Sequence, residues 1–172
     1  LEEIDQYCFC GSGVQRVSIP KSVTWLKSYA FSESDLREIA FEEPALTNQM
    51  GDCCFQKTQL EAIAIPSNVF LLHDKVFYQC RQLRRVTFAS ASCLRIIGGW
   101  CFSECPLQEV SIPRHVRAIQ TGAFCGCSAL RTVMLAEDSE LETIGSSAFQ
   151  GTALEEFVAP RALREIGAGA FR

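Results

Sequence analysis

Phenylalanine recurs along the chain at regular intervals, and apolar residues keep fixed distances from it. Eight of the twelve phenylalanines are separated by 22 to 25 residues, and an apolar residue stands five positions before each of them. A period of this length is typical of solenoids, in which each repeat forms one coil that contacts its neighbours. The phenylalanines that we expect to form this repeated core are Phe9, Phe31, Phe55, Phe77, Phe102, Phe124, Phe149 and Phe171.

A second pattern, L-x-x-[IV]-x-[apolar], follows the phenylalanine in each repeat. Its last three positions alternate with period two, which indicates a strand with one buried face. Because the run recurs once per repeat, we expect these strands to stack as one parallel ladder with a spacing of about 4.8 Å. The runs are VQRVSI, LREIAF, LEAIAI, LRRVTF, LQEVSI, LRTVML and LEEFVA.

Proline follows this run in every second repeat, at Pro20, Pro66, Pro113 and Pro160. Proline lacks an N–H group and therefore suits the end of a strand. The other repeats return by longer segments such as FEEPALT, so the larger unit is a pair of repeats of 46 to 47 residues.

Residues 1–172 are predicted to form a single solenoid domain of about seven and a half repeats. One coil alone buries too little apolar surface to offset its ordering entropy, so stacking must supply the rest. Both ends, LEEIDQYCF and REIGAGAFR, are ordinary repeat halves without polar caps. We therefore expect a fragment of a longer array, with neighbouring repeats or capping domains at both ends.

The combined consensus, L-x-x-[IV]-x-I-P-x-x-V-x-x-I-G-x-x-A-F-x-x-C, resembles the BspA-type, or Treponema pallidum-type, leucine-rich repeat. The clearest segments are VSIPRHVRAIQTGAFCGCSALRTV and LETIGSSAFQGTALEEFVAP, and the resemblance covers the whole chain. It implies a curved right-handed solenoid of α/β-type repeat, mostly β, with a parallel sheet on the concave face. Short strands, turns or 3-10 segments would lie on the convex side.

The resemblance also implies no cofactor and a role in recognition, since many family members are surface proteins of bacteria and protists. The sequence departs from the family pattern in the third repeat and at the glycine after the apolar residue. Asp5, Lys27, His73 and Gln120 replace that glycine in the first, second, fourth and sixth repeats.

The ten cysteines fall mostly on positions that other repeats fill with small residues. We interpret six as buried filler, and Cys10 and Cys125 as facing solvent, so Cys125 should react faster than Cys127. Disulfides between same-position cysteines of neighbouring coils stay open as an alternative, because the coil spacing falls within the Cα range of a disulfide. Their spacing does not match a structural zinc site, so we expect no metal. The six filler cysteines are Cys8, Cys54, Cys80, Cys101, Cys105 and Cys127.

Neither histidine, His73 or His115, recurs in the pattern or has a cysteine placed beside it by the repeat. No nucleophile, base and orienting group can be assembled, so we expect no catalytic residues. The acidic returns around Glu42 and Glu137 offer oxygen ligands for calcium, but a solvated loop explains them as well.

Charge and composition exclude several kinds of partner. The formal net charge is −4 with scattered basic residues, and no apolar stretch reaches eighteen residues. We therefore expect no nucleic-acid partner and no direct membrane insertion. The compartment stays open: the family resemblance favours the cell surface or secretion, whereas many unpaired thiols favour the cytoplasm.

The outward positions of the predicted strands form three stripes across the coils, and we expect a protein partner to bind there. Opposite charges on adjacent strands, Arg16 beside Glu38 and Arg85 beside Glu109, predict cross-strand ion pairs. Trp100 and Tyr78, on neighbouring coils, form a second candidate surface. The candidate partner-binding residues are Arg16, Arg37, Arg84, Arg85, Thr87, Ser111, Arg131, Met134 and Val158.

The sequence therefore predicts a non-enzymatic module for protein recognition, acting in adhesion or surface recognition through the concave sheet. An intracellular scaffold within a larger assembly is the alternative, and a cysteine-dependent enzyme is the third.

Overall fold

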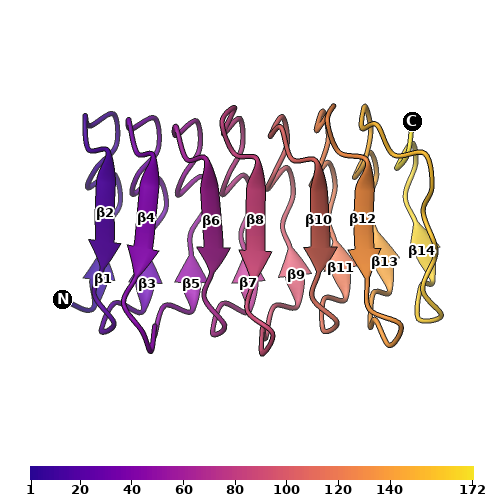
Figure 1. Cartoon of the computed structure of the whole chain (residues 1–172), viewed down its shortest axis with the longest axis horizontal. Helices are drawn as coiled ribbons and strands as arrows, with labels where there is room; N and C mark the ends of the chain where they lie inside the picture. Colours follow the sequence, from indigo (N-terminus) through magenta and orange to yellow (C-terminus); the bar gives the residue numbers. More distant parts are fainter.

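Each repeat forms one coil with a two-residue strand on one face and, in six coils, a four-residue strand on the opposite face (Figure 1). The computed structural model describes all residues from 1 to 172 and contains fourteen strands and no helix. The two-residue strands are β1 (Glu3–Ile4), β3 (Trp25–Leu26), β5 (Gln49–Met50), β7 (Leu71–Leu72), β9 (Ile96–Ile97), β11 (Ala118–Ile119), β13 (Thr143–Ile144) and β14 (Glu165–Ile166). The four-residue strands are β2 (Arg16–Ile19), β4 (Glu38–Phe41), β6 (Ala62–Ile65), β8 (Arg85–Phe88), β10 (Glu109–Ile112) and β12 (Thr132–Leu135).

The two-residue strands form one parallel sheet of eight strands, in the order β1-β3-β5-β7-β9-β11-β13-β14. Their second residues align in register, as Leu26 does with Met50, and these are the apolar residues five positions before each phenylalanine. All are buried except Ile166, which lies in the last coil and is half exposed. The predicted parallel-sheet solenoid is therefore confirmed.

The four-residue strands pair only two by two, β2 with β4, β6 with β8, and β10 with β12. The prediction of one continuous ladder on this face was wrong. The two interruptions, between β4 and β6 and between β8 and β10, both follow a longer return. We attribute them to the two or three extra residues of those returns, which change the path of the chain into the next coil.

Residues 156–159, the end of the run LEEFVA, form no strand, although the pattern predicts one. The preceding strand β12 is already paired with β10, and a longer return follows it. Because strands on this face pair within a two-coil unit, the partner of residues 156–159 would have to come from a following coil, and the structure contains none.

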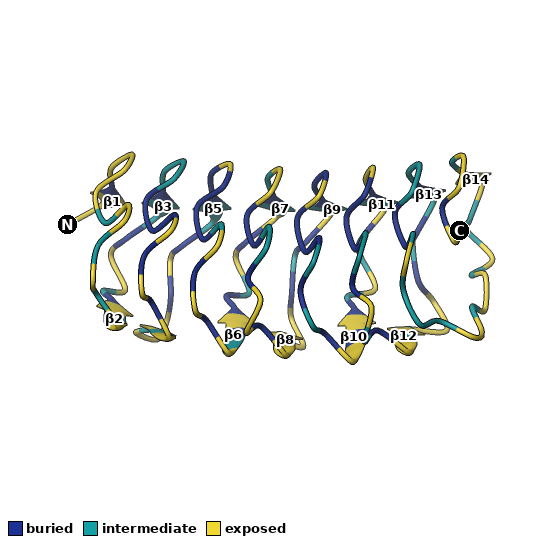
Figure 2. Cartoon of the chain, turned by 90° about the horizontal axis from the view of Figure 1, so that it is seen from above, coloured by how far each residue is buried: buried dark blue, intermediate teal, exposed yellow.

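The eight repeated phenylalanines form a stack of nearly parallel rings through the whole molecule. Neighbouring ring centroids lie 5.0 to 5.4 Å apart, with interplanar angles of 2 to 13°. The six inner rings are fully buried, whereas Phe9 is half-buried and Phe171 is exposed at the ends. Offset stacking of aromatic rings adds to the energy of area burial. Figure 2 shows the buried segments of successive coils lining one continuous interior, which holds 39 buried residues.

The segment around each phenylalanine forms a third hydrogen-bonded ladder that the hydrophobic pattern did not predict. The N–H groups of Phe31 and Glu33, for example, donate to the carbonyls of Cys54 and Gln56 in the next coil, at 2.9 and 2.8 Å. The residues two positions before and after each phenylalanine have left-handed backbone angles, and ten of these fifteen residues are not glycine. Alternating left- and right-handed residues can aim successive N–H groups in one direction.

Glycine after the apolar residue is required where consecutive coils approach most closely. A Cβ added to Gly145 would lie 2.5 Å from the Thr121 nitrogen, and one added to Gly98 would lie 2.6 Å from the Leu72 oxygen. Gly51 makes a similar approach to Ser28. At these three junctions the opposite face has no strand pairing. Gly167 in the last coil, which has no four-residue strand, approaches the Ser146 nitrogen more closely still.

Candidate functional site

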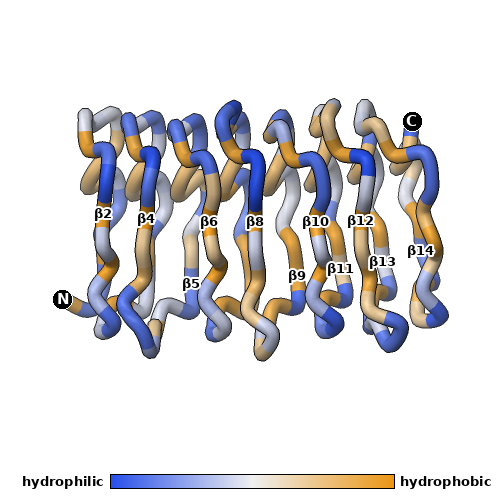
Figure 3. Tube along the Cα trace, viewed as in Figure 1, coloured by the Kyte–Doolittle hydropathy of each residue, from blue (hydrophilic) through white to orange (hydrophobic).

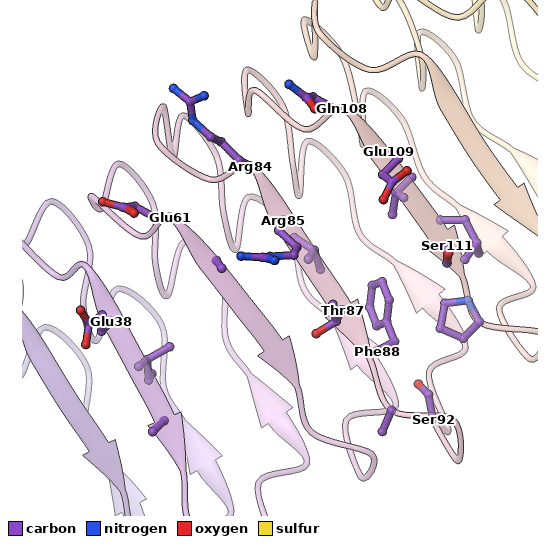
Figure 4. Close-up of a pocket in the computed structure, with 18 of the residues that line it drawn as sticks. Glu38, Glu61, Arg84, Arg85, Thr87, Phe88, Ser92, Gln108, Glu109 and Ser111 are labelled. Atoms are coloured by element: carbon purple, nitrogen blue, oxygen red, sulfur yellow. The ribbon is translucent and has the colours of Figure 1, made fainter.

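A groove of about 1390 Å³ lies over the four-residue strands and extends from β2 to β12. We call this surface the strand face. Five arginines and three glutamates line the groove together with small and apolar residues. Figure 4 shows the charged side chains at the start of β6 and β8, and Thr87 and Phe88 further along β8. Figure 3 likewise shows that the chain is hydrophilic at the start of β8.

The outward stripes predicted from the sequence are present on the strand face. All nine candidate partner-binding residues are exposed, and seven of them line the groove. Arg131 directly precedes β12 and does not line the groove. Val158 lies one coil further along and is 74% exposed. The seven that line the groove are Arg16, Arg37, Arg84, Arg85, Thr87, Ser111 and Met134.

One of the two predicted cross-strand ion pairs is formed. Arg16 Nε lies 3.1 Å from Glu38 Oε2, across the paired strands β2 and β4. Both side chains are well exposed, so the pair adds little to stability. Arg85 makes no ion pair with Glu109, and this prediction was wrong. The strands β8 and β10 are not hydrogen-bonded to each other, and Figure 4 shows the Arg85 side chain extending toward β6.

Three arginines occupy the same position, directly before the strand, in every second coil. Arg37, Arg84 and Arg131 precede β4, β8 and β12, and all three are exposed. None of them has an acidic group within 4.0 Å, whereas other cationic side chains of the same coils, Lys27, Arg81, Arg114 and Arg117, each have one. Their guanidinium groups are therefore available to a ligand.

An apolar part of the groove lies between β8 and β10, and the sequence did not reveal it. Val86, Phe88, Val110 and Ile112 occupy inward positions of their strands, yet they line the groove. The alternating pattern assigns such residues wholly to the core. Of the four, only Phe88 is partly exposed, while Val86, Val110 and Ile112 are buried beneath the groove as the pattern predicts. Val17 and Ile39 on the paired strands β2 and β4 line the groove in the same way. On the neighbouring strands β10 and β12, the Ser111 hydroxyl lies 3.8 Å from the Met134 sulfur.

Trp100 and Tyr78, the second candidate surface, do not share one site. Trp100 lines a smaller hollow of about 590 Å³ beside the eight-stranded sheet, and Tyr78 does not line it. The Trp100 ring packs over Gly122, where an added Cβ would lie 2.7 Å from ring atoms. Packing against this glycine explains the tryptophan without a ligand.

All ten cysteines are free in the structure. Three of the filler cysteines donate hydrogen bonds to the phenylalanine carbonyl of the preceding coil: Cys80 to Phe55 at 2.9 Å, Cys105 to Phe77 at 3.1 Å and Cys127 to Phe102 at 3.0 Å. Burial raises the pKa of Cys80 to about 11 and that of Cys127 to about 12. Buried thiols of this kind are inert.

Two of the predicted cysteine environments need correction. Cys8 is exposed rather than buried, because it lies in the first coil and is covered from one side only. Cys125 is half-buried rather than facing solvent. Its pKa is raised, mainly by burial and to a smaller extent by the nearby Glu104 carboxylate. Cys10 is exposed as predicted.

Both histidines lie beside surface carboxylates. His115 Nδ1 lies 2.7 Å from Glu140 Oε1, and Arg95 and Arg117 approach the other carboxylate oxygen at 3.3 and 3.2 Å. The hydrogen bond with His115 is the main reason why the pKa of Glu140 is lowered. His73 lies 3.7 Å from Asp52. No three His, Cys, Asp or Glu side chains are placed together to hold a metal ion.

The arrangement around both histidines contains no nucleophile oriented by a base. The structure has no helix long and apolar enough to cross a membrane. What the molecule presents instead is an extended groove with unpaired charges and an apolar part. Extended solenoid faces of this kind typically bind proteins.

Known structures share this fold. A leucine-rich repeat protein from Bacteroides ovatus has a TM-score of 0.75 at 21% identity, over 97% of this chain and 49% of its own. The Treponema pallidum leucine-rich repeat protein has a TM-score of 0.75 at 24% identity, over 88% of this chain and 70% of its own. A leucine-rich repeat protein from Eubacterium ventriosum has a TM-score of 0.70 at 23% identity, over 99% of this chain and 62% of its own.

The chain spans about half the length of the Bacteroides ovatus protein. No curated protein matches its sequence. The family model described as the BspA-type leucine-rich repeat region matches residues 2–127 and 48–172, which together include almost the whole chain. The chain therefore belongs to the BspA-type leucine-rich repeat family.

Proposed function

We propose that the chain is a protein-recognition module that holds a partner in the groove of the strand face and serves adhesion or recognition at a surface. The observation that carries the proposal is the combination, in one groove of about 1390 Å³, of unpaired arginines with an apolar part. Protein interfaces typically combine an apolar centre with a polar rim, and arginine is enriched in them.

The distribution of contacts supports the groove over the opposite face. The outward residues of the eight-stranded sheet come from strands of two residues, and its hollow is less than half as large. The groove spans six strands and exposes both charged and apolar side chains. Membership of the BspA-type family supports protein binding in general and is compatible with a surface role.

An intracellular scaffold is the second candidate, and one observation favours it. All ten thiols are free, which fits a reducing compartment better than an oxidising one. The two candidates share the groove and differ in compartment, so the same binding experiment serves both.

Site-specific photo-crosslinking tests the proposal. A photoreactive residue at Ser111 samples the groove, and one at Thr143 on β13 samples the opposite sheet. We expect a discrete protein adduct from Ser111 that is absent from Thr143 and is lost when Arg85→Glu is added. Circular dichroism verifies that each variant keeps the fold. Equal adducts from both positions, or no adduct from Ser111, would place recognition elsewhere.

A further inference from the structure

We infer that the groove takes an extended protein segment with acidic residues at every third position. The inference rests on the proposed function, which it narrows from a protein partner to one chemical class of segment. It starts from the row formed by Arg37, Arg84 and Arg131, which we call the arginine row. Arg37 and Arg84 line the groove, and Arg131 continues the row on the coil of Met134 without lining the groove itself.

Charge favours an acidic occupant. Five arginines and three glutamates line the groove, although the whole chain has a net charge of −4. Of these arginines, Arg16 and Arg114 are engaged by Glu38 and Asp138. The others have no acidic partner within the protein. A locally positive face on an acidic protein steers an acidic segment to this groove and repels it from the remaining surface.

The spacing of the arginine row fixes the spacing of the charges that it can meet. Successive phenylalanine rings are 5.2 to 5.4 Å apart through the coils that carry Arg37, Arg84 and Arg131. Two coil steps therefore come to about 10.5 Å at the phenylalanine stack, which we take as the approximate spacing of the arginine row, although each interval of the row also crosses one unpaired strand junction. A polyproline II segment rises about 3.1 Å per residue with three residues per turn, so its same-face side chains recur at about 9.3 Å. The flexible arginine side chains can absorb the difference.

The residues that lie between the arginines of the row determine which side chains a bound segment can have between its acidic residues. Glu61 and Gln108 occupy the same position as the arginines in the intervening coils, and both are exposed. Glu61 has no cationic group within 4.0 Å, since neither Arg37 nor Arg84 pairs with it in the structure. A carboxylate placed beside Glu61 would be repelled, so the two intervening residues of the segment are neutral.

The inference is tested with three fluorescein-labelled peptides. The first repeats Pro-Pro-Glu five times, the second has the same composition with its five glutamates in one block, and the third repeats Pro-Pro-Lys five times. Fluorescence anisotropy at low salt measures each dissociation constant. We expect the first peptide to bind at least tenfold more tightly than the other two, and this preference to weaken as salt is raised.

A matched pair of variants locates the binding. The triple variant Arg37→Gln, Arg84→Gln and Arg131→Gln should weaken binding of the first peptide at least tenfold. The control variant Arg161→Gln, Arg164→Gln and Arg172→Gln removes the same charge from exposed arginines outside the groove and should leave binding unchanged. All six substitutions are at exposed positions, and circular dichroism verifies the fold.

Several results would overturn the inference. If the peptide with glutamate at every third position and the peptide with its glutamates in one block bound equally well, the spacing of the acidic residues would not matter. If the triple variant bound the first peptide as tightly as the wild type does, the arginine row would not be part of the binding site. Dextran sulfate binding more tightly than every peptide, with the same dependence on the arginine row, would assign the row to anionic polysaccharides. A partner that crosslinks at Ser111 without needing the arginine row would leave the proposed function standing while this inference fails.

Discussion

The thiol of Cys127 donates a hydrogen bond to the carbonyl oxygen of Phe102, one coil earlier, across 3.0 Å. At the same position of other coils, the hydroxyls of Ser34 and Thr152 bond the phenylalanine carbonyl of their own coil, at 2.7 and 2.8 Å. In every coil that contains this position except the first, where the Ser12 hydroxyl has no partner, the position therefore satisfies a carbonyl of its own or of the preceding coil. This relationship explains why cysteine, serine and threonine interchange there without a metal or a disulfide.

Replacing Cys127 with serine should change stability little. The new hydroxyl can bond the Phe124 carbonyl as Ser34 bonds that of Phe31, so we expect a loss of less than about 1 kcal/mol in the free energy of unfolding. Cys127→Leu should cost about 1 to 3 kcal/mol, because the fully buried position has no room for the larger side chain. Urea unfolding of both variants measures the difference, and equal losses would show that size does not govern this position.

Thiol labelling should follow burial. We expect maleimide to modify Cys8 and Cys10 first, Cys125 more slowly, and Cys127 hardly at all under native conditions. The thiolate is the reactive form. Because burial raises the pKa of Cys127 to about 12, only about one thiol in ten thousand is ionised at pH 8, and its labelling rate should climb with pH up to about 12. Peptide mass spectrometry after timed labelling measures each rate, and labelling of Cys127 as fast as that of Cys125 would contradict the placement.

The glycines at the close coil junctions should be more sensitive than those in left-handed turns. Gly145→Ala places a Cβ against the backbone of Thr121, and we expect a loss near the upper end of the 1 to 3 kcal/mol that is typical of overpacking. Gly151→Ala meets only ordinary contacts at 3.8 Å but keeps a φ of +70°, so about 1 to 2 kcal/mol is expected. Thermal unfolding of the two variants gives the order, and a smaller loss for Gly145→Ala would refute the close junction.

The phenylalanine stack should lose most stability when it is cut in the middle. Phe102 is fully buried with a ring on each side, so Phe102→Ala should cost about 3 to 5 kcal/mol. Phe9 is half-buried and stacks on Phe31 alone, so Phe9→Ala should cost clearly less. Chemical denaturation compares the two, and equal losses would mean that the stack does not carry the core.

Repetition is what made the fold predictable. The positions of Phe31 and Leu26 recur in every repeat, so the coil, its core and its outward stripes could be derived without any contact information. The pairing of Arg16 with Glu38 follows from register alone. The missing pair between Arg85 and Glu109 does not, because it depends on whether two neighbouring strands are hydrogen-bonded.

The remaining differences have a common physical origin in the returns. A period of 22 residues and one of 24 or 25 fit the same sequence pattern but bring consecutive coils together differently. Phe88, at an inward position of β8, is partly exposed to the groove beside the gap between β8 and β10, whereas Val110 across that gap stays buried. The left-handed backbone conformation of Tyr29 and Trp100 could not be predicted from the sequence either, since neither residue type favours it.

The most direct test of the account is the affinity of a purified partner, once crosslinking has supplied one, for two matched double variants. Arg85→Glu with Met134→Ser alters an arginine and an exposed apolar residue in the groove, and Arg164→Glu with Leu46→Ser makes the same change outside it. Isothermal titration calorimetry should show that the groove variant loses at least a hundredfold in affinity, about 2.7 kcal/mol, while the control binds as the wild type does. Unchanged binding by a correctly folded groove variant would contradict recognition through the strand face.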